Sequence, residues 1–151
     1  MAFRRFDVPD EDDFYKSLMN EAQNVSILDI GNLYMSDDKE NQAYFYIKFM
    51  LCNTTQEQSV AYNVKFIDGD IIAPEGSKLF PLLSFVSGIE DGEIHCTKTD
   101  IDDALKGKTF KMKAKRQKGK QTWYKLIPLE SASVEWVFMY FFDEFQKGDE
   151  T

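Results

Sequence analysis

The stretch KGKTFKMKAKRQKGKQTWYK, residues 106–125, is the part of the sequence that decides the fold. In its first half, apolar and basic residues alternate with the period of two that is typical of a strand with one buried face. The segment QKGK has the composition of a turn, and TWYKLIPL returns as a second strand, so residues 108–127 predict a β-hairpin. The residues predicted to face the core are Phe110, Met112 and Ala114, and those predicted to face outward are Lys111, Lys113 and Lys115.

The same stretch gathers positive charge in an acidic protein. It holds nine of the 18 Lys and Arg residues of a 151-residue chain whose formal charge is −8. No Asp or Glu falls between Asp103 and Glu130, while the rest of the chain is strongly acidic. This distribution excludes a globally basic nucleic-acid-binding protein. It favours one basic face on an acidic body, which would repel polyanions elsewhere.

Outside the hairpin, the sequence predicts three strands and several short helices. Alternation of apolar and polar residues indicates the strands, and helical spacing with Ser77 and Thr99 as N-caps indicates two short helices between the third strand and the hairpin. Gly88 and Gly107 are expected to end these helices. The predicted strands are 25–35, 42–53 and 59–70, and the predicted outer helices are 11–23 and a C-terminal segment after Pro128.

The order of these elements predicts a mainly β fold with flanking helices. Three strands, a helical interruption and a two-stranded hairpin follow the order of a five-stranded OB-type Greek-key barrel. We expect an acidic helical extension at residues 1–24, an OB-fold domain at 25–130, and an aromatic helix with an acidic tail at 131–151. The OB-type barrel would then carry both an N-terminal and a C-terminal helix.

Two segments extend this expectation to a family. GSKLFPLLSFVSG (76–88) followed by DALKGKTFKMKAKRQKGKQTWYKLI (103–127) resembles small OB-fold single-stranded DNA-binding proteins of phages and other mobile elements. The residues that carry the resemblance run from Leu105 to Lys115, in the pattern Leu-x-Gly-Lys-x-Phe-x-x-x-x-Lys. The resemblance implies a cytoplasmic protein that binds single-stranded DNA in replication or recombination.

The candidate nucleic-acid-binding residues combine cations with aromatic rings. Cations spaced by about 6.8 Å on one face of a strand suit the phosphates of an extended single strand, and an exposed indole suits base stacking. Outer-face residues of the second and third strands are expected to extend this surface. The candidates are Lys108, Lys111, Lys113, Lys115, Arg116, Lys118, Lys120, Trp123 and Lys125 on the hairpin, with Tyr44, Tyr46, Lys48 and Lys65 beyond it.

Several alternatives stand beside this interpretation. Lysines on an exposed strand also protect a sheet edge from aggregation. The alternation favours Trp123 outside and Tyr124 inside, yet the reverse arrangement also fits the sequence. Tyr44 and Tyr46 fit a core beneath a terminal helix as well as an open face.

Catalytic and metal-binding chemistry is weakly indicated. Asp68 and Asp70 flank a glycine in a typical turn, and acids at 100–103 suit a helix start, although both groups would also suit a nuclease metal site. The single His95 leaves little scope for acid–base chemistry, and Cys52 and Cys96 are expected to be free thiols. We therefore predict a protein that is not an enzyme and needs no cofactor or metal.

The C-terminal segment suggests a competing function. Its apolar stripe is expected to pack on the barrel, on a second copy in a dimer, or on another protein. In the alternative hypothesis the protein is an OB-fold interaction or oligomerisation module, and the lysines only solubilise an edge. No apolar run is long enough to predict a membrane span. The residues of the predicted partner surface are Trp136, Phe138, Phe141, Phe142 and Phe145.

Overall fold

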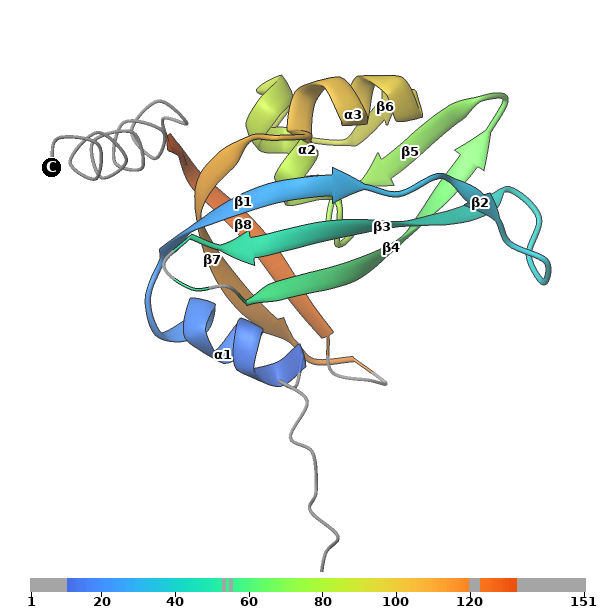
Figure 1. Cartoon of the computed structure of the whole chain (residues 1–151). Helices are drawn as coiled ribbons and strands as arrows, with labels where there is room; N and C mark the ends of the chain where they lie inside the picture. Colours follow the sequence, from blue (N-terminus) through green and yellow to red (C-terminus); the bar gives the residue numbers. More distant parts are fainter. Residues whose placement is uncertain (1–10, 53, 55, 120–122, 133–151) are drawn as a thin grey trace, which may run out of the picture.

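The computed structural model describes residues 11–52, 54, 56–119 and 123–132, and its long strands lie where the sequence alternates with period two. These described residues form a curled antiparallel half-barrel with three helices packed against it (Figure 1). Its helices are α1 (Glu11–Asn20), α2 (Phe80–Ser87) and α3 (Lys98–Leu105). Its strands are β1 (Gln23–Ile30), β2 (Tyr34–Met35), β3 (Gln42–Leu51), β4 (Glu57–Ile67), β5 (Asp70–Pro74), β6 (Glu93–Cys96), β7 (Thr109–Gln117) and β8 (Trp123–Ala132).

Strand β1 lies inside the sheet and joins two parts of the chain that are far apart in sequence. The strand order is β6-β5-β4-β3-β1-β7-β8, with β2 paired to β3. On one side β1 pairs with β3, and on the other with β7. Ser26 Oγ and Thr109 Oγ1 lie 2.7 Å apart across the second junction, although 83 positions separate them in the chain. The predicted count of five strands is not confirmed, because the described residues form eight.

One hydrophobic core fills the half-barrel. The inward faces of β3 and β4 contribute Phe45 and Tyr62, and the inward faces of β7 and β8 contribute Met112 and Leu126. In Figure 1, α1 lies below the sheet, and α2 and α3 lie above it. From α1, Phe14 reaches the core and lies 6.3 Å from the ring of Phe49. Residues 11–20 therefore belong to the same packed body as the strands.

Two of the differences from the predicted strands change the arrangement of the sheet. The segment 25–35 is interrupted: β1 ends at Ile30, and after residues 31–33 the short strand Tyr34–Met35 continues in the same direction along the same edge of β3. Gly31 lies at this interruption, where its N–H donates to the carbonyl of Tyr46. Residues 71–74, predicted within the helical interruption, instead form β5, which pairs with both β4 and β6. A short apolar run fits a strand as well as a helix, and the neighbouring strands decide the outcome here.

Both predicted N-caps between β5 and β7 were wrong by about two residues. The N-cap of α2 is Leu79, without a side-chain hydrogen bond, and Ser77 lies before the helix. The N-cap of α3 is Thr97, whose hydroxyl accepts from the N–H of Asp100 while the Asp100 carboxylate accepts from the N–H of Thr97. The predicted stop was confirmed for α2, where Gly88 is the C-cap with φ +75°.

The C-terminal prediction falls largely outside the described residues. β8 continues through Ala132, so residues 131 and 132 extend a strand where a helix was expected to begin. The predicted aromatic helix and its partner surface, residues 133–151, lie outside the described part of the chain. In the described part, no helix is long and apolar enough to span a bilayer.

Candidate nucleic-acid interface

The hairpin of β7 and β8 has the alternation that the sequence predicts. Phe110, Met112 and Ala114 are buried in the core. Lys111, Lys113 and Lys115 are exposed on the other face. The two strands are in register, with Ala114 opposite Leu126 and Lys115 opposite Lys125, so the buried and the basic faces each continue onto β8.

The two aromatic residues at the start of β8 point to opposite faces. Tyr124 stacks on Tyr15 of α1, with ring centroids 4.4 Å apart and an angle of 11° between the rings, and packs against the core. Trp123 pairs with Gln117 on the outward face and is half-buried. The Lys125 ammonium lies 5.3 Å from the centre of the Trp123 ring. The predicted orientation of these two residues is therefore confirmed.

We call Lys111, Lys113, Lys115, Trp123 and Lys125 the hairpin face. Lys111 Nζ lies 4.0 Å from Glu130 Oε1, at the limit of an ion pair. Within the described residues, no carboxylate forms an ion pair with the other three lysines of this face. Their positive charge is therefore available to a ligand.

The remaining predicted cations of the stretch are arranged differently. Arg116 is exposed but pairs with Tyr124, so it projects from the opposite face of the hairpin. Lys108 precedes β7 and Lys118 lies near the turn, both exposed, while Lys120 falls outside the described residues. Lys106 contacts Asp29 at 3.4 Å. The pKa of Asp29 is lowered by a backbone hydrogen bond at Ile30 and then by Lys106.

A groove adjoins the hairpin face where α2 packs against β8. It has a volume of about 420 Å³. The outward residues Lys115 and Lys125 line it together with Phe80 and Phe85 of α2. The sequence did not predict this groove, because it requires α2 to lie beside β8.

A second surface, the tyrosine face, comprises Tyr34, Tyr44, Tyr46, Lys48 and Lys65 on β2, β3 and β4. Tyr34 and Tyr44 are stacked at 5.6 Å, and Tyr46 meets Tyr44 edge to face at 6.2 Å. Tyr34 and Tyr46 are about half exposed, so these tyrosines are not core residues. Lys48 Nζ lies 3.6 Å from Glu57. Tyr34 was missed, since its place opposite Tyr44 depends on the register in which β2 pairs with β3.

The structure does not bring the two surfaces together. Lys111 lies opposite Asn24 of β1, whereas Tyr46 lies beside Gly31. From Asn24 to its end at Ile30, β1 spans about 20 Å, and Lys48 of the tyrosine face lies nearer to Lys111, opposite Asp29. In addition, β3 and β4 on one side and β7 and β8 on the other enclose one core with their inward faces. The outward faces of these two pairs of strands therefore point in different directions (Figure 1). The single continuous surface expected from the sequence is therefore divided in two.

The acidic residues considered for a nuclease metal site do not form one in the described part of the chain. No group of three or more His, Cys, Asp or Glu side chains that suits a metal ion occurs among the described residues. The pKa of Asp100 is lowered by its backbone and side-chain hydrogen bonds with Thr97 in the capping box. Cys52 and Cys96 are free thiols. Burial, then the charges of Asp100 and Asp70, raise the pKa of Cys96 to about 11.

Comparisons with known proteins add no family assignment. No family model, no curated protein and no solved structure matches this chain. The resemblance to single-stranded DNA-binding proteins therefore stays a prediction.

Proposed function

We propose that this protein binds single-stranded nucleic acid through the hairpin face, without catalysis and without strong sequence preference. The observation that carries the proposal is the row Lys113, Lys115 and Lys125 beside Trp123, with no carboxylate paired to these lysines in the described structure. Residues 111, 113 and 115 follow one face at about 6.8 Å steps. This spacing is close to one phosphate step of an extended strand.

The indole supplies the second element of such an interface. Stacking on an aromatic side chain contributes about 1–3 kcal/mol per base and tolerates any sequence. Trp123 is half-buried, so we expect a base to meet the open part of its ring beside the Lys125 ammonium. Phosphate contacts of the lysines supply the salt-dependent part of the affinity.

We further propose that the half-barrel is of the OB type. The pairing of β1 with both β3 and β7 supports this, because a Greek-key barrel requires such a non-consecutive contact. OB-folds bind oligonucleotides across their second and third strands. These strands correspond to β3 and β4, so the tyrosine face would form a separate contact for the same ligand. DNA in replication or recombination is favoured over RNA by the sequence resemblance.

A charge-reversal experiment tests the proposal. Binding of a fluorescein-labelled thymidine oligomer is measured by anisotropy for the wild type, for Lys113→Glu/Lys115→Glu, and for Lys16→Glu/Lys39→Glu. The control pair has the same change in net charge and changes lysines that are exposed outside the hairpin. We expect the hairpin variant to lose at least 100-fold in affinity and the control to lose much less. Equal losses in both variants would refute the hairpin face as the binding site.

The same experiment separates the alternative function. If the protein is an interaction or oligomerisation module that works through residues 133–151, the wild type will not bind the oligomer at micromolar concentration. Its oligomeric state, measured by sedimentation, would then respond to Phe141→Ser/Phe142→Ser and not to the lysine changes.

A further inference from the structure

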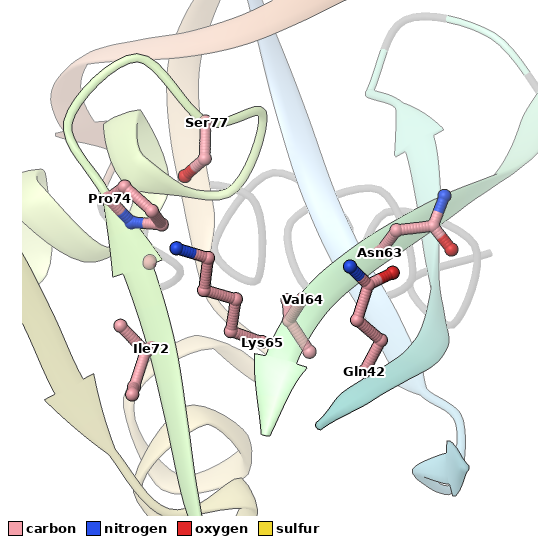
Figure 2. A pocket seen from close by; sticks show the side chains of 8 residues that line it. Gln42, Asn63, Val64, Lys65, Ile72, Pro74 and Ser77 are labelled. Carbon is pink, nitrogen blue, oxygen red and sulfur yellow. The ribbon is translucent and has the colours of Figure 1, made fainter. Parts of the chain in front are cut away.

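A small pocket with a mainly apolar lining and a few polar groups lies where β3, β4 and β5 meet the loop before α2. Its volume is about 250 Å³, smaller than the pockets that hold drug-sized ligands. Figure 2 shows the ammonium of Lys65 and the hydroxyl of Ser77 pointing toward the same space beside Pro74, with the amide of Gln42 on the other side of Val64. We call it the β4–β5 pocket. The other residues that line it are Asn63, Ile72 and Ala73.

The polar groups of this pocket suit an anion. The ammonium of Lys65 donates only, and the hydroxyl of Ser77, which points toward the same space (Figure 2), also carries a donor. Ser77 Oγ is buried and has no hydrogen-bond partner among the described residues. No acidic residue lines the pocket, and in the described structure Lys65 forms no ion pair. A bound anion would satisfy both the buried hydroxyl and the ammonium.

The walls of the pocket hold these donors in place. The N–H of Ser77 donates to the carbonyl of Pro74 at 3.0 Å, which closes the turn. The next residue, Lys78, donates to the carbonyl of Ala61 at 3.0 Å and fixes the loop to β4. The nearby Glu75 carboxylate accepts from the N–H of Gly92 instead of facing Lys65. The loop that carries Ser77 is therefore fixed to β4 in the absence of ligand.

An aromatic surface continues directly from the pocket. Asn63 lies opposite Tyr44 in the register of β3 and β4, and Gln42 lies opposite Lys65. Tyr44 in turn contacts the rings of Tyr34 and Tyr46. An anion pocket one residue pair away from a row of rings suits a ligand that carries a phosphate next to a base.

We infer that the β4–β5 pocket binds the phosphomonoester of a nucleotide, with its base against the tyrosine face. The phosphate has two chemical sources, a free mononucleotide or the phosphorylated end of a strand, and the pocket chemistry is the same for both. This inference uses a different wall of the protein from the hairpin face and does not depend on it.

Amide NMR shifts of the full chain test the inference. The probes are thymidine 5′-monophosphate, thymidine, acetate, and a short thymidine oligomer with or without a 5′-phosphate. We expect the monophosphate to shift the amides of Val64 and Ala73 saturably, and thymidine and acetate to leave them unchanged. Lys65→Gln should weaken the affinity roughly tenfold and Ser77→Ala roughly threefold, as the loss of hydrogen bonds to a charged ligand predicts. The matched control is Lys16→Gln, on the exposed side of α1.

Each result has a defined meaning. If the oligomer with a 5′-phosphate shifts the Val64 and Ala73 amides at lower concentration than the monophosphate, and the oligomer without it does not shift them, the inference is supported and a strand end is the source. Equal binding supports it and identifies a free nucleotide. No saturable shift with any phosphate, equal shifts with acetate, or an affinity unaffected by Lys65→Gln would overturn it. The monophosphate shifts are repeated in Lys113→Glu/Lys115→Glu, where they should persist whether or not the hairpin face binds nucleic acid.

Discussion

Loss of the Tyr15–Tyr124 stack should show how strongly α1 supports the hairpin. The rings lie 4.4 Å apart and nearly parallel, and Tyr15 is 2% exposed. Tyr15→Leu removes a buried ring and should lower the free energy of unfolding by about 2–3 kcal/mol. Tyr124→Leu should cost about 1–2 kcal/mol, because its ring is less buried. The double variant should lose less than the sum, by a coupling energy of about 0.5–1.5 kcal/mol.

Urea unfolding followed by far-UV circular dichroism measures all four proteins of this cycle. The matched control combines Tyr15→Leu with Phe85→Leu on α2, on the other side of the sheet from α1 in Figure 1. Phe85 contacts the ring of Phe110 at 5.6 Å, so its loss also removes an aromatic pair. The control pair should be additive within about 0.3–0.5 kcal/mol. A coupling for Tyr15 and Tyr124 no larger than the control value, despite normal single losses, would refute the stacked arrangement.

Three further predictions concern binding, helix capping and a thiol. Affinity for a thymidine oligomer should fall with salt at a log–log slope of roughly −3 to −4, for four to six phosphates, and a slope near zero would count against an electrostatic interface. Thr97→Ala should lower the free energy of unfolding by about 1 kcal/mol through loss of the capping box, measured by urea titration, whereas Thr99→Ala should change it little. Alkylation of Cys96, followed by mass spectrometry, should accelerate up to about pH 11 in the folded protein. Because the unfolded thiol ionises at lower pH, this group also removes stability as the pH rises toward 11.

The alternation of apolar and basic residues correctly predicted which side chains of the hairpin are buried. The predictions that failed concern features that depend on contacts with neighbouring strands and helices. Burial at 110, 112 and 114 follows from a period that each strand carries in its own sequence. The cap of α3 was misplaced because Thr97 and Thr99 both precede an Asp by three residues. A start at Thr97 forms the box with Asp100 and leaves Asp102 to accept from Lys98 at 2.6 Å. Two overlapping signals of equal strength cannot be separated without the packed helix.

The sequence predicted which side chains of a single strand lie on its outer face, but it did not predict how the strands are arranged around the candidate site. The lysine row was found because its cations alternate with core residues along one strand. The separation of the lysine row from Tyr44 and Tyr46 was not predicted, because this separation depends on how far the sheet curls around its core. The β4–β5 pocket was also missed, because Lys65 and Ser77 meet only when residues 70–74 form a strand beside β4. Contacts of this kind arise from tertiary structure and leave no period in the sequence.

The position of β1 between β3 and β7 has a consequence for the order in which the chain acquires its structure. β1 can pair with β3 across a short connection as soon as both exist. Its other neighbour, β7, is much more distant in the sequence, and the Ser26–Thr109 contact closes a loop of 83 positions. Such a closure costs roughly 4 kcal/mol in chain entropy beyond its constant term. Until β7 emerges from the ribosome, one edge of β1 is without its native partner. We therefore expect joining of β1 to β7 to be the slow step of folding.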